Sequence, residues 1–188
     1  MANYIKSWQF LTLAPEMMYK PVRRNQGGPS VRMQSSGENL ADFFSRLQDS
    51  PPQLHLILEK MRYVLPELAD LTAKHDNLRK EVFLQMLEKS LPEPLASWLL
   101  STGTLRILAM LALFNGKEVP PVTFIEEIEN GLDPRTLNLL VAEIRGILGE
   151  HQVITTTHSP YFLDLVDLRH IIVAERNQGQ TEYFRPAD

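Results

Sequence analysis

The pattern of apolar positions predicts several helices. Leu105–Phe114 is almost entirely apolar, and a helix without a polar face must be buried. From Pro134 to Gly149 the apolar residues fall on one face, as in a helix with one side against a core. Helices are also predicted over Asn39–Gln48, over Gln53–Leu65, where apolar residues recur at helical spacing, and over the short segment Pro160–Val166.

Shorter apolar runs predict strands between the later helices. Val122–Ile125 is continuous, apolar and bounded by turn signals, as expected for a buried parallel strand. Gln152–Thr157 predicts a second strand, whereas Ile171–Ala174 and Thr181–Phe184 flank a turn and predict a hairpin. Strands that alternate with helices favour an α/β fold with a largely parallel sheet.

The first part of the chain has a different character. Prolines and glycines interrupt it, and its basic residues are Lys20, Arg23, Arg24 and Arg32. We therefore expect residues 1–99 to comprise a lead-in that runs over the surface and a helical segment. Val82–Leu87 within them fits a strand or a helical turn, with strand favoured. Residues 100–188 are expected to form the functional core of a single domain.

Composition excludes several classes of protein. The chain has 188 residues, 44% of them apolar, which suffices for one substantial core and argues against disorder. A formal net charge of -4 does not fit a protein that coats nucleic acid or anionic lipid. With no cysteine and no apolar run of the roughly 18 residues that span a bilayer, we expect no membrane association and a cytoplasmic location.

Charged residues follow both predicted parallel strands. Glu126 and Glu127 come directly after Val122–Ile125, and His158 comes directly after the next strand. Ligands of open α/β sheets bind beyond the carboxyl ends of the strands. Because close like charges destabilise each other unless a positive group relieves them, the carboxylates indicate a solvated turn or a cation site.

Three motifs stand in order along the chain: Leu100-Ser-Thr-Gly-Thr-Leu-Arg106, Phe124-Ile-Glu-Glu-Ile-Glu-Asn-Gly-Leu-Asp-Pro134 and Ile154-Thr-Thr-Thr-His-Ser-Pro160. Together they resemble the C-terminal half of an ABC-class ATPase, a family with the P-loop NTPase fold. They are most similar to the soluble branch related to RecF, SMC and the OLD nucleases. Residues 100–160 carry the resemblance, and residues 1–75 match only loosely.

The first motif resembles the signature loop of these ATPases. The resemblance implies that Ser101 and Gly103 contact the γ-phosphate of an ATP held by the opposite subunit. A helix that starts near Thr104 would direct backbone donors and the positive end of its dipole toward that anion. Ser101 and Thr104 also suit a plain helix cap.

The other two motifs resemble catalytic segments. Glu126 falls on the Walker B aspartate, which orients Mg²⁺ through water, and Glu127 falls on the general base that activates the attacking water. Asp133 falls in the D-loop at the subunit interface, although it also suits a helix cap before Pro134. His158 falls on the switch histidine that senses the γ-phosphate, or serves only as a turn residue.

A Walker A loop, G-x-x-x-x-G-K-[ST], is absent from the 188 residues. Gly116-Lys117 is followed by glutamate, and Gly27-Gly28 has no Lys-Ser or Lys-Thr after it and reads as a surface loop. In the family the Walker A strand lies beside the strand that ends in the switch histidine. Its absence predicts an open strand edge, to be filled by a separate Walker A-bearing polypeptide, by self-association or by Tyr4–Leu13, with the first two favoured.

Two classes of function therefore remain. The chain is either the C-terminal portion of an ATPase that hydrolyses Mg-ATP once a Walker A half joins it, or a non-hydrolysing remnant that acts as a binding or regulatory module. A role in DNA maintenance or defence rests on family analogy alone, and we expect no strong DNA binding by this chain.

Overall fold

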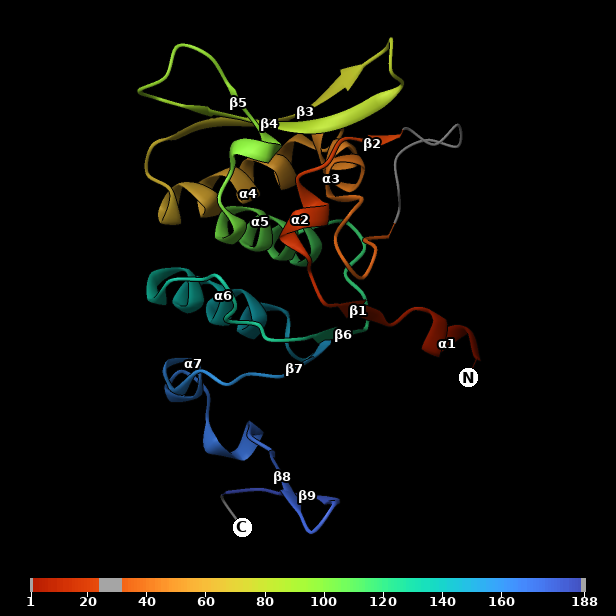
Figure 1. The fold of residues 1–188 in the computed structure, drawn as a ribbon, viewed down its shortest axis with the longest axis vertical. Helices are drawn as coiled ribbons and strands as arrows, with labels where there is room; N and C mark the ends of the chain where they lie inside the picture. The colour runs from red at the N-terminus through yellow and green to blue at the C-terminus, as the bar shows by residue number, and fades with distance from the viewer. Residues whose placement is uncertain (1, 24–31, 187–188) are drawn as a thin grey trace.

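A computed structural model of the chain describes residues 2–23 and 32–186 and has an α/β architecture. Its central sheet contains β1 (Gln9–Leu11), β6 (Val122–Ile125) and β7 (Gln152–Thr155), all parallel, in the order β1-β6-β7. The α/β fold with a parallel sheet flanked by helices, predicted from the alternation of strands and helices, is confirmed (Figure 1).

A second, antiparallel sheet lies on the far side of the helices from the parallel sheet (Figure 1). It contains β2 (Val22–Arg23), β3 (Leu68–Asp76), β4 (Glu81–Glu88) and β5 (Leu95–Ala96), with β4 paired to the other three. The strand favoured over Val82–Leu87 is confirmed as part of β4. Its long partner β3 has no counterpart in the sequence analysis.

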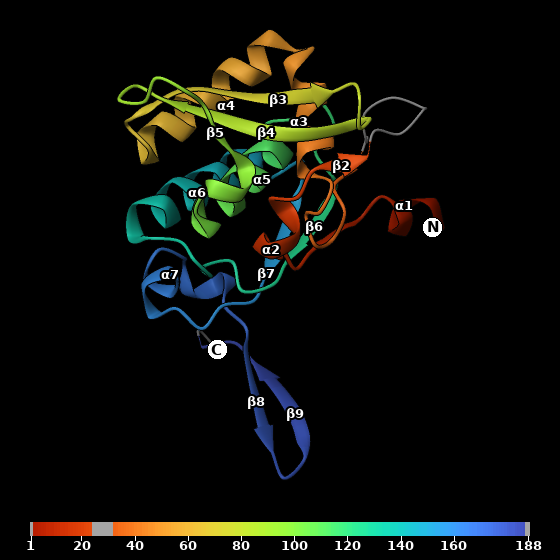
Figure 2. The same ribbon diagram turned by 45° about the horizontal axis from the view of Figure 1, so that its top comes forward.

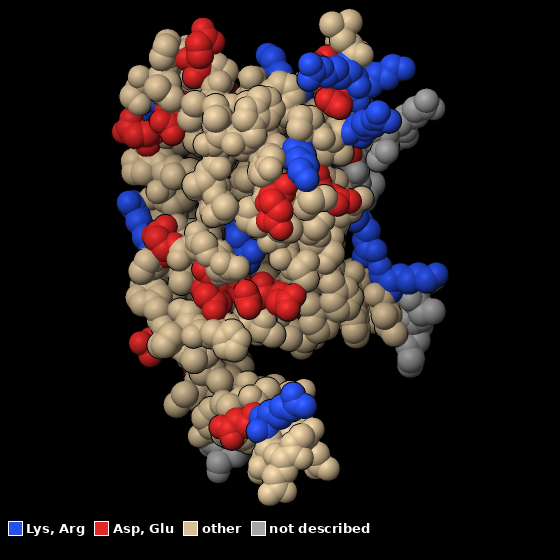
Figure 3. All heavy atoms as spheres, viewed as in Figure 1, with Lys and Arg blue, Asp and Glu red and all other residues tan. Residues whose placement is uncertain are grey.

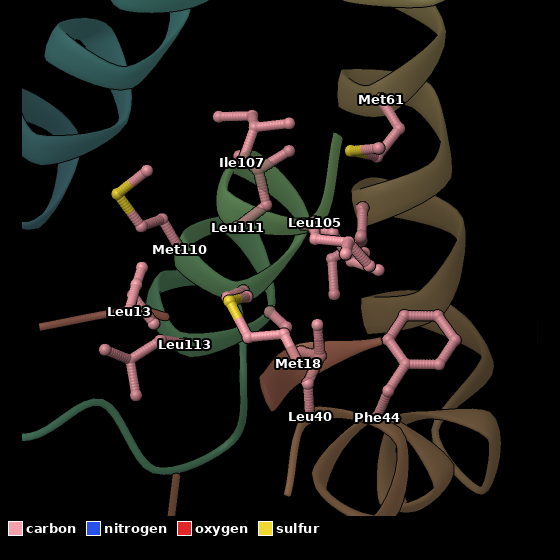
Figure 4. Close-up of a cluster of buried hydrophobic side chains, with 14 of the residues drawn as sticks. Leu13, Met18, Leu40, Phe44, Met61, Leu105, Ile107, Met110, Leu111 and Leu113 are labelled. Atoms are coloured by element: carbon pink, nitrogen blue, oxygen red, sulfur yellow. The ribbon is translucent and has the colours of Figure 1, made fainter. Parts of the chain in front are cut away.

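The core is built around α5 (Thr102–Phe114), in which every side chain from Thr104 to Phe114 is buried. This confirms the burial predicted for Leu105–Phe114. The helix contacts α2 (Pro15–Met18), α3 (Leu40–Gln48), α4 (Pro51–Val64) and α6 (Pro134–Ile147). Figure 4 shows its side chains among apolar residues of the neighbouring segments, including Leu13, Met18, Leu40, Phe44 and Met61.

The remaining elements lie toward the two ends of the chain. They are α1 (Ala2–Lys6), α7 (Pro160–Asp164), β8 (Val173–Asn177), β9 (Gln180–Phe184) and the short 3-10 turns Ser97–Leu99 and Leu168–His170. The predicted C-terminal hairpin is present as β8 and β9, and it projects away from the body (Figure 2). None of the helices in the described parts of the chain is long and apolar enough to cross a membrane.

The lead-in is not the loose surface segment that its prolines and glycines predicted. Leu11, Leu13 and Met18 are fully buried, because β1 enters the central sheet beside β6 and α2 packs on α5. The predicted loop at Arg24 and Gly27-Gly28 lies outside the described residues.

Tyr4–Leu13 also fails to fill the slot considered for it. Its strand β1 pairs with β6 on the side away from β7, so that this repair of the open edge is wrong.

Candidate functional site

The carboxyl ends of β1 and β6 meet at a pocket of about 540 Å³. Its walls come from the segment after β1, the start of α5 and the loop after β6. Glu126 and Glu127 line it together with Thr102, Arg106 and Asn130. Acidic side chains gather in a row over the region of α6 and β6 on the face seen in Figure 3.

The backbone of Glu127 is held on both sides. Its amide donates to Thr156 Oγ1 at 3.0 Å, and its carbonyl accepts from Arg106 Nη2 at 2.8 Å and from the Asn130 amide at 3.0 Å. Its φ of 45° lies in the left-handed region, which is unfavourable for any residue but glycine. The side chains of Glu126 and Glu127 are nevertheless exposed, so the backbone is fixed while the carboxylates remain accessible.

Arg106 lies beneath this loop with 3% of its surface exposed. Besides the carbonyl of Glu127, its guanidinium binds the carbonyl of Leu13 through Nη1 at 2.7 Å. Burial lowers the pKa of Arg106, while the carboxylates of Glu127 and Glu129 act in the opposite direction. An arginine remains protonated in spite of this shift, so a buried positive charge contacts the loop that carries Glu127 and Glu129.

The segment after β7 is tied to the same loop. The backbone amide of His158 donates to Glu129 Oε1 at 2.7 Å, and the Thr156 carbonyl accepts from the Ile128 amide at 3.2 Å. The pKa of Glu129 is lowered: burial acts to raise it, but hydrogen bonds from the His158 amide and the Thr157 hydroxyl outweigh that effect. His158 itself is exposed. The two strand ends therefore form one connected loop cluster.

The amino end of α5 contacts this cluster through glycine. Ser101 caps the helix, since its Oγ accepts from the Thr104 amide at 3.0 Å and lies 2.7 Å from Thr104 Oγ1. A Cβ on Gly103 would lie 2.3 Å from the carbonyl oxygen of Gly131, and Gly131 has a φ of 73°. Gly103 is thus required because the backbone of Gly131 approaches it closely, and Gly131 is required because its φ is positive.

Asp133 caps α6. Its Oδ1 accepts from the amides of Arg135 and Thr136 at 2.9 and 3.1 Å, and its Oδ2 accepts from Thr136 Oγ1 at 2.6 Å. These hydrogen bonds, that of the Thr136 hydroxyl first, lower the pKa of Asp133 against a smaller effect of burial. The capping role considered for Asp133 is thus present in the structure.

The donor chemistry at the pocket fits Mg²⁺ in part. Glu126 and Glu127 offer exposed carboxylate oxygens, the ligands this hard cation prefers. No group of three or more histidine and acidic side chains among residues 2–23 and 32–186 could hold a metal ion alone. A magnesium ion here would need phosphate and water oxygens as further ligands, as is usual for Mg²⁺ bound with a nucleotide.

The structure brings only some of the predicted site residues to the pocket. Glu126 and Glu127 line it, and Gly103 touches its rim at Gly131. The pocket lining does not include the other predicted residues, which are Ser101, Thr104, Asp133 and His158. Sequence reasoning missed the roles of Arg106 and Thr156. Arg106 carried a signal, because a charged residue inside an otherwise apolar helix needs buried partners. Thr156 carried none.

A family model described as "AAA domain, putative AbiEii toxin, Type IV TA system" matches residues 11–164. The chain belongs to this family. The match runs from the last residue of β1 to the end of α7 and therefore includes the pocket and all three motifs. No curated protein matches the chain.

Solved structures of SMC heads share the fold of this family member. One, from work on ATP-driven dimerisation and DNA-stimulated activation of SMC ATPases, has a TM-score of 0.57 at 14% identity, covering 76% of this chain and 88% of that one. An SMC head bound to the C-winged helix domain of ScpA has a TM-score of 0.58 at 13% identity, covering 97% and 52%.

An SMC head with a coiled coil and joint from Pyrococcus yayanosii has a TM-score of 0.55 at 16% identity, covering 79% of this chain and 28% of that chain. At these identities the likeness concerns the fold. The chain is therefore an ATPase-like domain with the P-loop NTPase fold of SMC heads, and it spans only part of the second and third of these chains.

Proposed function

We propose that this chain is the C-terminal portion of an ABC-class ATPase that hydrolyses Mg-ATP when a Walker A-bearing half completes it. The observation that carries the proposal is the held position of Glu127 at the pocket, between Arg106 and Thr156. A glutamate whose backbone is held at the end of a parallel strand, with its carboxylate free to reach the pocket, supports a role as general base.

Each site residue has a role in this proposal. Glu126 contributes an oxygen ligand to Mg²⁺, directly or through water, and Glu127 accepts the proton of the attacking water. Mg²⁺ bound to the nucleotide neutralises charge on the β- and γ-phosphates. Ser101, Gly103 and Thr104 present the amino end of α5 to the γ-phosphate of a nucleotide held by another subunit. His158 falls on the switch histidine and senses the γ-phosphate, and Asp133 supports the subunit interface while capping α6.

The open edge of β7 supports the need for a second half. Within residues 2–23 and 32–186, β7 pairs only with β6. The amides of Gln152 and Thr156 donate to Pro121 and Ile125, so those of Val153 and Thr155 face the unpaired side. An open strand edge takes up another strand readily.

One face of the central sheet supports the same conclusion. Phe10, Phe124 and Ile154 occupy the same register across the three strands and therefore project on one face. The rings of Phe10 and Phe124 stack with their centroids 4.6 Å apart, and the ring centroid of Trp8 lies 5.7 Å from that of Phe124. Phe10 is 51% exposed and Ile154 is 42% exposed. A row of apolar side chains beside an open edge fits a missing layer that supplies both a strand and a covering helix.

The proposed partner is thus the polypeptide that carries the Walker A loop, encoded in an adjacent reading frame or in a longer form of this chain. Self-association through the β7 edge is the second way to close the sheet. A role in defence is consistent with the toxin named in the family's description, and a role in DNA maintenance rests on analogy with SMC proteins. We place the protein in the cytoplasm.

The test is nucleotide hydrolysis by the chain co-purified with its Walker A half. We expect Mg²⁺-dependent ATP turnover that Glu127→Gln abolishes without loss of ATP binding. Glu150→Gln, which alters an exposed carboxylate in a turn, is the matched control and should retain full turnover. If the completed protein binds ATP but shows no turnover, the chain is a non-hydrolysing remnant with a binding or regulatory role.

A further inference from the structure

Two residues next to the pocket share an uncommon backbone conformation. Four non-glycine residues of the described chain have positive φ: Leu13, Lys80, Glu127 and Gln178. Lys80 and Gln178 lie in hairpin turns, where positive φ is ordinary. Leu13, with a φ of 26°, and Glu127, with a φ of 45°, instead each lie two positions after a strand of the central sheet.

The same side chain holds both residues. Arg106 donates through Nη1 to the carbonyl of Leu13 at 2.7 Å and through Nη2 to the carbonyl of Glu127 at 2.8 Å. These partners are 93 and 21 residues away along the chain. A left-handed conformation at a residue with a side chain persists only where its surroundings enforce it. The forked guanidinium holds both residues at once, Leu13 after β1 and Glu127 after β6.

Arg106 is well placed to act on the pocket. Leu13, Arg106 and Glu127 all line it, and Arg106 arises from α5, the helix whose amino end touches Gly131. With 3% of its surface exposed and its Nε atom buried without a hydrogen-bond partner, the side chain is held by the two carbonyls and its packing. Movement of α5 would therefore be transmitted to both strand ends.

We propose that Arg106 is a positioning residue that holds the Leu13 and Glu127 loops in their left-handed conformations and thereby sets the direction of the Glu127 carboxylate. The catalytic importance of the carboxylate's direction rests on the proposed function. The claim that Arg106 holds the two backbone conformations rests on the geometry alone. Its consequence is that the loop after β1 and the loop after β6 respond together to any change at Arg106.

The experiment measures amide hydrogen exchange by NMR in the chain and in its Arg106→Lys variant, which keeps the charge but loses the fork. The reporters are the Ala14 amide, bound to Ser36, and the Asn130 amide, bound to Glu127. We expect both to exchange about tenfold faster, as for the loss of one hydrogen bond to a charged group. The three-bond amide–Hα coupling of Glu127, which depends on φ, should shift as well.

Arg62→Lys is the matched control. Arg62 also binds two carbonyls, those of Leu68 and Ala69, but at a different part of the molecule. It should leave the Ala14 and Asn130 amides and the Glu127 coupling unchanged. A response of only one loop to Arg106→Lys, or of neither, would overturn the proposal.

A rescue separates positioning from a general loss of packing. Glycine adopts positive φ without enforcement, so Glu127→Gly added to Arg106→Lys should restore slow exchange at Asn130 but not at Ala14. Failure to restore Asn130 would contradict the proposal.

A third measurement needs no change at Arg106. Glu127→Gly alone should raise the thermal midpoint by relieving strain, whereas Glu126→Gly, at a neighbour without positive φ, should lower it. A lower midpoint for Glu127→Gly would overturn the proposal. None of these measurements uses nucleotide, so their outcome can be told apart from the presence or absence of ATP turnover in the completed protein.

Discussion

Gly103 at the start of α5 and Gly131 in the loop after β6 approach so closely that a Cβ on Gly103 would lie 2.3 Å from the Gly131 carbonyl oxygen. The obstacle is backbone, which cannot rotate away as a flexible side chain can. The contact joins the motif that resembles a signature loop to the motif that carries Glu126 and Glu127. A glycine at this position thus has a packing reason that is independent of any nucleotide.

Gly103→Ala should therefore destabilise the fold by about 1–3 kcal/mol, the usual range for inserting a methyl group into a filled space. Gly146 in the last turn of α6 provides the control, because nothing lies within 4 Å of a Cβ built there. Gly146→Ala should not destabilise the fold and should stabilise it by at most about 0.5–1 kcal/mol through helix propensity. Urea denaturation measures both changes. If Gly103→Ala left the free energy of unfolding unchanged, the two loops would not be in contact.

Asp133 predicts a dependence of stability on pH. Its pKa in the folded chain lies below the ordinary 3.8, so its contribution to stability is present above that value and is lost as pH falls through the folded pKa. Asp133→Ala should cost about 1 kcal/mol at neutral pH through loss of the cap. The difference between wild type and Asp133→Asn should shrink in unfolding experiments as pH falls below 3.8. If the difference in the free energy of unfolding between wild type and Asp133→Asn stayed constant down to strong acid, the cap would not be an ionised carboxylate.

The β7 edge predicts a variant that folds but does not associate. Ile154→Lys places a charge on the uncovered sheet face, so the isolated chain should change in stability by less than about 0.5 kcal/mol. Binding to the Walker A half should be lost, because a lysine would be buried there without a partner. Leu78→Lys is the control, since Leu78 is 97% exposed in the turn between β3 and β4 and far from the edge in sequence. Urea denaturation of the isolated chain measures the first effect, and pull-down with the Walker A half measures the second. Normal assembly of Ile154→Lys would place the partner elsewhere.

Weak DNA binding is expected of this chain by itself. Its formal net charge is -4, so the chain as a whole does not attract the phosphate backbone. Fluorescence anisotropy with a labelled duplex at low salt should give at most a weak signal that disappears at physiological salt. A tight, salt-sensitive complex would require a phosphate-binding surface that the present account lacks.

The parts of the fold with a strong local pattern could be predicted from sequence. Leu105–Phe114 has no polar face, so its burial follows from composition alone. Val122–Ile125 ends where the carboxylates begin, so the sequence alone predicts Glu126 and Glu127 at the carboxyl edge of the sheet. The position of the candidate site at this edge was thus predictable.

The remaining parts depend on contacts between distant segments. Gln9–Leu11 is a three-residue strand in which Leu11 is buried and Phe10 is half exposed, and only its pairing with β6 identifies it. Leu68–Asp76 mixes apolar with charged residues and becomes a strand through pairing with β4. The two carbonyls that Arg106 binds could not be predicted from sequence, because every residue has a backbone carbonyl and the sequence does not show which ones a side chain will reach.

Mg-ATP calorimetry on the purified chain, alone and joined to its Walker A half, tests most directly the claim that this chain contributes catalytic residues to a site it does not complete. Glu127→Gln, measured alongside, keeps hydrolysis from obscuring the binding signal. The account predicts no binding by the chain alone and binding by the joined protein. Binding of micromolar strength by the chain alone would contradict it, because a complete phosphate-binding loop would then lie within these 188 residues.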